Sequence, residues 1–195
     1  EAGGPALVDL VIDVLNEAVP FVVITQGPLI GLCVMAARAG VGNAHLNGQL
    51  GIGMVHQHFM LIPTHTVVEN LVLGLQAQRG RLKLRKAAED ILSLSNQLGF
   101  QIDPWSVVKD LPVGTQQKVE ILKSIYRGAK LLIMDEPTAV LTPQEVDEFF
   151  VTMRQMVDDG HALIFISHKL HEVIDISNRV SVLRDGHMIG TIPTK

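Results

Sequence analysis

The stretch that most constrains the fold of this chain is Leu131–Thr138, which reads LLIMDEPT. Its first four residues are apolar, too few for a helix, and predict a short strand buried on both faces of a parallel sheet. Asp135 and Glu136 follow at the point where that strand must end. Two adjacent carboxylates are costly to bury unless a cation or a reacting water uses them. The pattern fits either a Mg²⁺ site at Asp135, with Glu136 polarising a water, or a solvated acidic turn.

Other segments agree with the first of these interpretations. In chain order they resemble motifs of the ATP-binding cassette (ABC) ATPases: the Q-loop in Met54–Phe59, the signature motif in Leu111–Ile121, the Walker B motif and D-loop in Leu131–Thr142, and the H-loop strand in Ile164–His168. The residues of these segments are most similar to those in the cassettes of sugar and nucleoside importers. The resemblance runs from about Gly51 to the C-terminus.

The resemblance implies an α/β fold, a P-loop NTPase-like cassette with a mostly parallel sheet and an inserted helical lobe. The lobe would occupy about residues 64–127 of a cassette that spans residues 51–195. Residues 1–50 would be a divergent N-terminal segment in place of the P-loop region. The alternation of strand-like and helix-like patterns after residue 51 is typical of such a fold.

The resemblance also implies ATP and Mg²⁺ as cofactors and gives roles to single side chains. Asp135 and Gln57 would hold Mg²⁺, and Glu136 would be the general base. Gln57 and His168 would position the attacking water and the γ-phosphate. The signature residues Gly114, Thr115 and Gln116 would contact ATP held by a second cassette. Taken alone, a glutamine is more often a surface residue and a histidine more often a structural one.

Two departures from the family pattern bear on these roles. An ABC cassette carries GxxGxGK[S/T], whose backbone amides and lysine bind the phosphates. Gly40 and Gly42 can be placed on that pattern, but Asn43 stands in the place of lysine and Ala44 in the place of serine or threonine. We therefore interpret this stretch as a glycine-rich loop that does not bind phosphate. In the signature, Pro112 replaces the usual serine and offers neither a hydroxyl nor an N–H group.

Composition and charge exclude several classes. The net charge is −4 and the mean hydropathy +0.30, so a basic surface for nucleic acid is not expected. A single cysteine, Cys33, excludes a disulfide framework and fits a reducing compartment. No signal-peptide pattern follows Glu1. The uncharged stretch Ala18–Ala37 is broken by Pro20 and Pro28, which favours two buried strands over a membrane span.

Local patterns predict the remaining elements. The predicted helices are Leu7–Ala18, Thr66–Leu75, Leu82–Leu98, a helix after the Thr142–Glu145 capping box, and Lys169–Ser177. The predicted strands are Phe21–Thr25, Gly51–His58, Ala162–Ser167 and a hairpin of Arg179–Arg184 with His187–Ile192. Leu29–Ala37 fits a strand or a helix.

Three functions remain open at this point. The first is an ABC import ATPase that couples ATP hydrolysis to uptake of a sugar or nucleoside. It would work with transmembrane permease subunits, a second cassette and, indirectly, a solute-binding protein, and would lie on the cytoplasmic face of the membrane. The second is a non-hydrolysing structural or regulatory cassette, or a truncated fragment, that pairs with a competent subunit. The third, a DNA-repair or translation-factor ATPase, is disfavoured because basic runs are absent.

Overall fold

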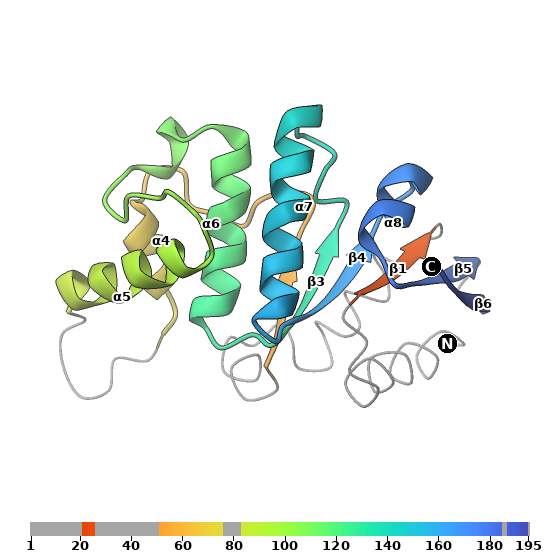
Figure 1. The fold of residues 1–195 in the computed structure, drawn as a ribbon. Helices are drawn as coiled ribbons and strands as arrows, with labels where there is room; N and C mark the ends of the chain where they lie inside the picture. Colours follow the sequence, from red (N-terminus) through yellow and green to blue (C-terminus); the bar gives the residue numbers. More distant parts are fainter. Residues whose placement is uncertain (1–20, 26–50, 76–82, 185–186, 195) are drawn as a thin grey trace.

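The computed structural model describes residues 21–25, 51–75, 83–184 and 187–194, which form an α/β fold around one sheet (Figure 1). The strands of these segments are β1 (Phe21–Thr25), β2 (Ile52–Val55), β3 (Leu131–Asp135), β4 (Ala162–Ile166), β5 (Arg179–Arg184) and β6 (His187–Pro193). Their order in the sheet is β2-β3-β4-β1-β5-β6. Neighbouring strands run parallel except β5 and β6, which form an antiparallel hairpin. The predicted α/β class and mostly parallel sheet are confirmed.

Strand β3 lies between β2 and β4, as its apolar run predicts. Its four apolar residues are at most 4% exposed, so both faces of the strand are covered. The register pairs Val55 of β2 with Met134, and Asp135 with Ile166 of β4. Because parallel strands end at the same edge of a sheet, the residues that follow β2, β3 and β4 lie along one edge.

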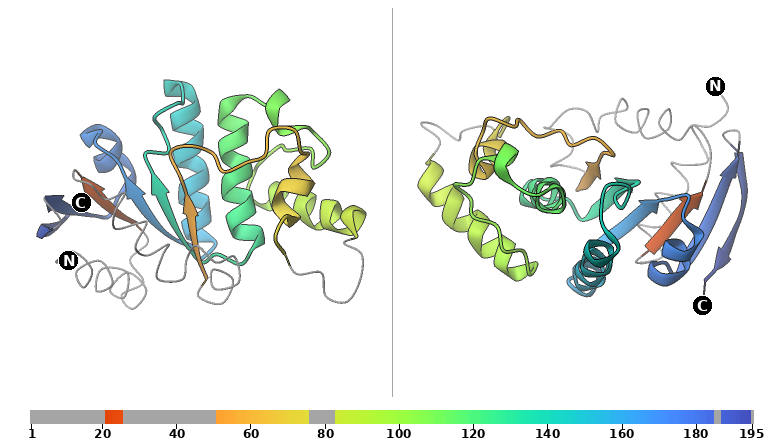
Figure 2. Two further views of the ribbon diagram at one scale, coloured as in Figure 1. Left: turned by 180° about the vertical axis from the view of Figure 1, so that it is seen from behind. Right: turned by 90° about the horizontal axis from the view of Figure 1, so that it is seen from above.

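Three helices cover one face of this sheet: α6 (Val113–Tyr126), α7 (Pro143–Asp158) and α8 (Leu170–Ile176) (Figures 1 and 2). Helix α6 packs on β2 and helix α7 on β4. The rings of Phe150 in α7 and Phe165 in β4 meet edge to face, with centroids 6.1 Å apart. The α7 side chains that complete this layer of the core are Phe149, Met153 and Met156.

The described chain between β2 and β3 is largely helical and lies where the helical lobe was predicted. It contains α4 (Val67–Val72), α5 (Leu84–Gln97), the 3₁₀ turn η2 (Val108–Asp110) and then α6. Figure 2 shows α4 and α5 beyond the β2 edge of the sheet. Helix α5 buries Ala87, Ala88 and Ile91. Leu92 is 44% exposed and lines a surface hollow on the lobe.

Helix starts follow the predicted capping chemistry. Thr142 caps α7 with its side chain, and the carboxylate of Glu145 returns to the backbone N–H of Thr142 at 2.8 Å. Thr66 and Glu69 form the same capping box at the start of α4. The helix predicted over Thr66–Leu75 is shorter, since α4 ends at Val72 and Gly74 adopts a φ of 80°.

Other boundaries differ by a few residues. The strand predicted over Gly51–His58 stops at Val55, the last residue paired with β3. Strand β1 is confirmed and lies between β4 and β5. The predicted helix Leu7–Ala18 and the ambiguous stretch Leu29–Ala37 lie outside the described residues. The division of the chain at residue 50 and the limits of the helical lobe stay predictions.

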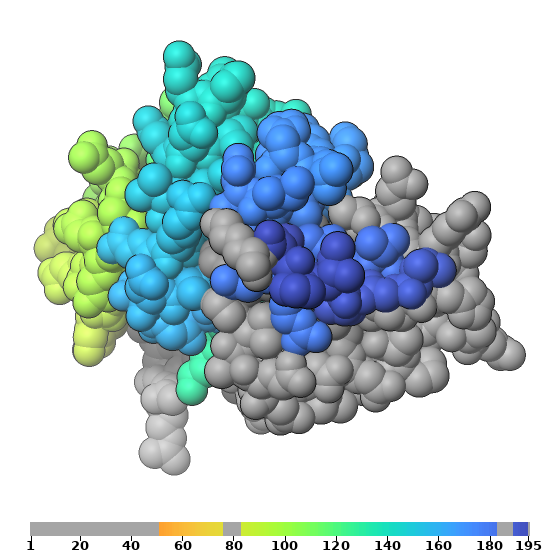
Figure 3. Space-filling view, turned by 45° about the vertical axis from the view of Figure 1, so that its right-hand side comes forward, coloured from red at the N-terminus to blue at the C-terminus, as the bar shows by residue number. Residues whose placement is uncertain are grey.

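Helix α8 and the β5–β6 hairpin lie side by side at the surface (Figure 3). Apolar side chains are exposed on both elements, among them Leu170 and Ile174 of α8 and Ile189 and Ile192 of β6. None of the helices in the described segments is long and apolar enough to cross a membrane.

Candidate functional site

Two side chains predicted to be catalytic meet at the carboxyl edge of the sheet. Strand β3 ends with Asp135 and is followed by Glu136, and β4 is followed two residues later by His168. The Nδ1 atom of His168 lies 2.7 Å from Oε1 of Glu136. The side chains are 59% and 30% exposed, respectively, so the pair faces solvent and can be reached by a ligand.

The backbone at Glu136 adopts an unusual conformation. Its φ is 45°, and among the described residues it alone has a positive φ without being glycine. The N–H group of Glu136 donates to the carbonyl oxygen of Ile166 at 2.9 Å, and its own carbonyl accepts from Ala139 at 3.1 Å. A left-handed conformation at a residue with a side chain is strained, so these bonds must hold it in place. The resulting turn directs the Glu136 side chain to His168 and away from the strand.

Asp135 is in an environment that suits a bound cation. Burial raises the pKa of its carboxyl group above the ordinary value, the neighbouring charge of Glu136 raises it further, and His56 has a smaller opposite effect. A divalent cation would offset the cost of an ionised carboxylate at this position. A carboxylate oxygen is also a ligand that Mg²⁺ accepts. The described residues contain no group of three or more His, Cys, Asp or Glu side chains that could hold a metal by themselves. Asp135 therefore fits Mg²⁺ bound by one or two protein ligands, with waters and phosphate oxygens as the others.

Gln57 is not brought into contact with the two acids. It lies two residues after β2, on the same edge of the sheet, and its side chain is exposed. Within the described part of the chain it forms no hydrogen bond to Asp135 or Glu136. The predicted phosphate-loop candidates Gly40 and Gly42, with Asn43 and Ala44, lie outside the described residues.

The signature residues lie at the start of α6. The helix begins at Val113, and its N-cap residue Pro112 makes no side-chain hydrogen bond to the helix. The Gln116 amide donates to the carbonyl oxygen of Leu111 at 2.9 Å. Thr115, Gly114 and Pro112 line a small hollow of about 220 Å³ against α7. These residues make no hydrogen bond to Glu136 or His168 in the described segments.

Gly114 has a structural role that the sequence did not suggest. Its φ is not positive, but a Cβ atom at this position would lie 2.8 Å from Oε1 of Glu145. Glu145 is the capping-box acid of α7, and its other oxygen accepts from the backbone and side chain of Thr142. A Cβ atom at position 114 would therefore displace the carboxylate of Glu145.

Several polar residues around the site were missed at the level of sequence. The buried Gln117 amide of α6 donates to the carbonyl oxygen of Pro137, directly after Glu136. Glu172 of α8 is buried and accepts from Thr138. The position of Thr138 two residues after Glu136 was a signal that this residue lies near the site. Nothing local in the sequence marks Gln117 or Glu172 as buried.

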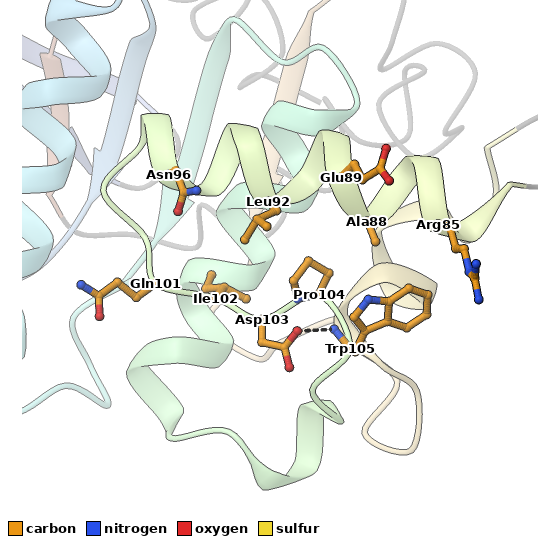
Figure 4. Close-up of a pocket in the computed structure, with 10 residues that line it drawn as sticks. All are labelled: Arg85, Ala88, Glu89, Leu92, Asn96, Gln101, Ile102, Asp103, Pro104 and Trp105. Carbon is orange, nitrogen blue, oxygen red and sulfur yellow. Dashed lines mark hydrogen bonds between the residues drawn. The ribbon is translucent and has the colours of Figure 1, made fainter.

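A second hollow lies on the helical lobe, away from the acids. It has a volume of about 830 Å³ and is bounded by α5 and the Gln101–Trp105 segment (Figure 4). Leu92, Ile102 and Pro104 contribute apolar surface, and the Trp105 ring is half exposed beside them. The Asp103 carboxylate accepts from the backbone N–H group of Trp105 at 3.0 Å (Figure 4). This hydrogen bond stabilises the turn that carries the Trp105 side chain.

Comparisons with known proteins agree with the geometry. The sequence model of the ABC transporter family matches residues 42–139. The nucleoside import ATP-binding protein NupA of Lactococcus lactis subsp. cremoris is 48% identical over 144 residues, covering 73% of this chain and 28% of NupA. The guanosine import ATP-binding protein NupO of Bacillus subtilis is 44% identical, covering 83% of this chain and 32% of NupO. The ribose import ATP-binding protein RbsA 3 of Rubrobacter xylanophilus is 41% identical, covering 80% and 31%. The chain spans about three tenths of these relatives.

Solved structures share the fold at lower sequence identity. The structure of cbiO1 from Clostridium perfringens, described as part of the ABC transporter complex cbiONQ, has a TM-score of 0.72 and 21% identity, covering 90% of this chain and 77% of that one. The dimeric structure of MJ0796, a bacterial ABC transporter cassette, has a TM-score of 0.71 and 20% identity, covering 90% and 86%. Identity this low supports the fold alone.

Proposed function

The chain belongs to the ABC transporter family, and on this basis we propose that it couples ATP binding and hydrolysis to import of a small solute. The relatives named above are import ATP-binding proteins for nucleosides, guanosine and ribose. We therefore assign the solute to the sugar or nucleoside class. The partners are transmembrane permease subunits and a second cassette, and the chain works on the cytoplasmic face of the membrane.

The observation that carries this proposal is the contact of His168 with Glu136, 2.7 Å apart, beside Asp135 at the end of a buried strand. In the proposed mechanism Asp135 holds Mg²⁺, which would bring phosphate oxygens to this edge and offset their charge. Glu136 accepts a proton from the attacking water, and His168 orients Glu136 through Nδ1. Gln57 is exposed at the same edge, where a ligand can reach it.

The signature residues have a different role in this proposal. In a cassette pair, Gly114, Thr115 and Gln116 face the nucleotide of the second subunit. The N-terminus of α6 offers unpaired backbone N–H groups and the positive end of the helix dipole. Pro112 lacks the hydroxyl that would add a contact to that nucleotide.

The hollow on the helical lobe is the surface that we assign to the permease. Trp105 and Leu92 are 50% and 44% exposed, and the charged residues Arg85, Glu89 and Asp103 also line the hollow (Figure 4). An apolar floor with a charged rim is typical of a protein interface. The hollow lies on the lobe, so a permease loop bound there would leave the edge with Glu136 and His168 open to nucleotide.

A specific observation favours a second function, that of a non-hydrolysing cassette. Asn43 and Ala44 stand where the family pattern has lysine and a hydroxyl residue, and Pro112 stands where the signature has serine. Such a chain would pair with a competent cassette and contribute only its signature helix.

A titration of Mg-ATP into the isolated chain tests its phosphate loop, and the turnover of a complex separates the two functions. Because no phosphate loop is recognisable, we expect affinity far weaker than micromolar and no hydrolysis above background in the isolated chain. We also expect that Asn43→Lys does not restore binding. In a complex in which the site of this chain is complete, Glu136→Gln should abolish its turnover and retain nucleotide binding. Unchanged turnover in that variant would remove Glu136 from the mechanism and favour the second function.

A further inference from the structure

A buried carboxylate lies behind the Glu136–His168 pair and has no role in the mechanism above. Glu172 of α8 is 3% exposed. Its Oε2 atom accepts from the Thr138 hydroxyl at 2.6 Å, and its Oε1 atom lies 2.9 Å from the Lys169 ammonium group. Lys169 also donates to the carbonyl oxygen of Thr138 at 3.3 Å. Thr138, Lys169 and Glu172 thus form a closed cluster, which we call the Glu172 cluster.

The position of the Glu172 cluster in the chain connects it to the site. Thr138 follows Glu136 by two residues, and Lys169 directly follows His168. The cluster therefore joins the loop that carries Glu136 to the loop that carries His168, across 34 residues of sequence. Both loops leave the sheet at the same edge, so small shifts in either would change the distance between the two side chains.

Helix α8 is also attached to the core by apolar side chains. Val173 and Ile176 are almost fully buried and belong to the hydrophobic core. A buried ion pair is weak support for stability, since desolvation offsets most of its Coulomb energy. The cluster can instead fix the position of one loop relative to the other. Hydrogen bonds are directional and therefore define the distance and orientation of the two loops more closely than apolar contacts do.

Glu136 needs such a restraint. Its φ of 45° is strained for a residue with a side chain, and strain of this kind persists only where surrounding contacts hold it. Pro137 and Thr138 follow immediately. Thr138 is almost fully buried and bonded through its hydroxyl and its carbonyl to the Glu172 cluster. The backbone downstream of Glu136 is therefore fixed by polar contacts from α8.

We propose that Glu172, through Thr138 and Lys169, is a positioning residue that holds Glu136 and His168 within hydrogen-bonding distance of each other. The consequence for catalysis rests on the proposed function, in which Glu136 is the base. The effect on geometry does not, because it concerns only contacts among residues of this chain.

The experiment measures the contact itself, by the ¹⁵N chemical shift of His168 Nδ1 in the folded chain. Two changes open the Glu172 cluster. Thr138→Val removes the hydroxyl at nearly constant volume. The double variant Lys169→Met/Glu172→Met removes both charges and the acceptor of the Thr138 hydroxyl together, so no unpaired charge is left buried. The matched controls are Thr138→Ser, which retains the hydroxyl, and Ser177→Ala, which removes a buried hydrogen bond to Val173 at the other end of α8.

The expected result is loss of the hydrogen-bonded Nδ1 signal in Thr138→Val and in the double variant, with the signal retained in Thr138→Ser and Ser177→Ala. An unchanged signal in both cluster variants would overturn the proposal. Where a complex containing the chain hydrolyses Mg-ATP, the cluster variants should lower kcat by roughly ten- to a hundredfold with little change in KM. A lost signal with no hydrolysis in any version would contradict the proposed function and leave the positioning role supported.

Discussion

The ammonium group of Lys123 in α6 lies 2.7 Å from the carbonyl oxygen of Met60, three residues after Gln57. Further along the same helix, Arg127 donates to the carbonyl oxygen of Leu73 at 2.6 Å, where α4 has just ended. Helix α6 thus holds the loop after Gln57 at one point and the end of α4 at another. Its N-terminus carries the signature residues, so a shift of the loop would be transmitted to them through the helix.

Replacing Lys123 by methionine tests this attachment. Lys123 also lies 3.6 Å from the carboxylate of Glu120, which is 3% exposed. Without its cation, that buried carboxylate should lower the free energy of unfolding by about 3 kcal/mol in urea titrations. The double variant Lys123→Met/Glu120→Gln should recover more than half of the loss. Equal instability of the single and double variants would show that the charge of Glu120 is not the cause.

Gly53 in β2 should not tolerate a methyl group. A Cβ atom there would lie 2.9 Å from the side chains of Ala129 and Leu132, against strand β3 and the end of α6. We expect Gly53→Ala to lower the free energy of unfolding by about 1–3 kcal/mol. Gly190→Ala in β6 is the control, because no atom lies within 4 Å of its added Cβ and its φ is not positive. It should be neutral or slightly stabilising. Similar losses in both variants would contradict the packing explanation.

Asp135→Asn should stabilise the chain at neutral pH in the absence of Mg²⁺. The pKa of Asp135 is raised in the fold, chiefly by burial and then by the charge of Glu136. The folded form therefore binds the proton more tightly than the unfolded form does. The favourable contribution of Asp135 to the free energy of unfolding is present below its ordinary pKa of 3.8. It is lost as the pH rises through the raised pKa of the folded state. At pH 7 the ionised carboxylate opposes folding, and asparagine removes that penalty.

The pH dependence of unfolding checks this explanation. The urea midpoint of Asp135→Asn should exceed that of the unmodified chain at pH 7, and the difference should shrink as the pH falls toward 4. Asp90→Asn, at an exposed position in α5, should change the midpoint little at either pH. A lower midpoint for Asp135→Asn at pH 7 would mean that the carboxylate makes a favourable contact that the raised pKa does not reflect.

Much of the fold follows from local patterns in this chain. The apolar run Leu131–Met134 predicts β3, and Thr142 with Glu145 predicts the start of α7 to the residue. Both features are local, since one depends on burial of consecutive residues and the other on contacts within one helical turn. Glu136 and His168 were each selected through the family resemblance, which did not predict their contact, and the structure places the two side chains 2.7 Å apart.

The features that were missed depend on contacts between distant segments. Thr138 and Glu172 are 34 residues apart, and Gln117 and Pro137 are 20 apart. In a helical sequence pattern, polar residues such as these are predicted to lie at the surface. Their buried partners come from distant segments and are known only from the tertiary fold. The place of β1 in the middle of the sheet is likewise set by long-range pairing.

Substitutions at positions 114 and 145 test whether packing against Glu145 explains the glycine at position 114, without a measurement of nucleotide binding. We expect Gly114→Ala to destabilise the chain, because its Cβ would displace the carboxylate of Glu145. In the background of Glu145→Ala that clash is absent. Alanine is favoured over glycine in a helix by about 0.8–1.0 kcal/mol, so the same substitution should then become stabilising. Urea titrations of the four versions form a double-mutant cycle. Gly114→Ala with the same effect in both backgrounds would exclude Glu145 as the reason for glycine.

The last prediction concerns Pro112, which caps α6 without a side-chain hydrogen bond. Its φ of −54° and ψ of 151° suit an N-cap residue, so serine should fit there and bond to a free N–H group of the first turn. We expect Pro112→Ser to raise the free energy of unfolding by about 1 kcal/mol. In a dimer with a competent cassette, the added hydroxyl would also reach the partner's nucleotide. A hydrogen bond to a charged oxygen contributes about 1.5–3 kcal/mol, so the partner's ATPase rate should rise roughly ten- to a hundredfold.

The free energy of unfolding and the partner's ATPase rate distinguish the two expected effects of Pro112→Ser. Pro112→Ala is the control, since it removes the ring and supplies no hydroxyl. It should raise neither the stability nor the partner's rate. A gain in stability for Pro112→Ser without a change in rate, with dimer formation confirmed by gel filtration, would mean that the hydroxyl caps α6 and does not reach a nucleotide. In that case the start of α6 would have a structural role only, and the assignment of Gly114, Thr115 and Gln116 to the partner's ATP would be wrong.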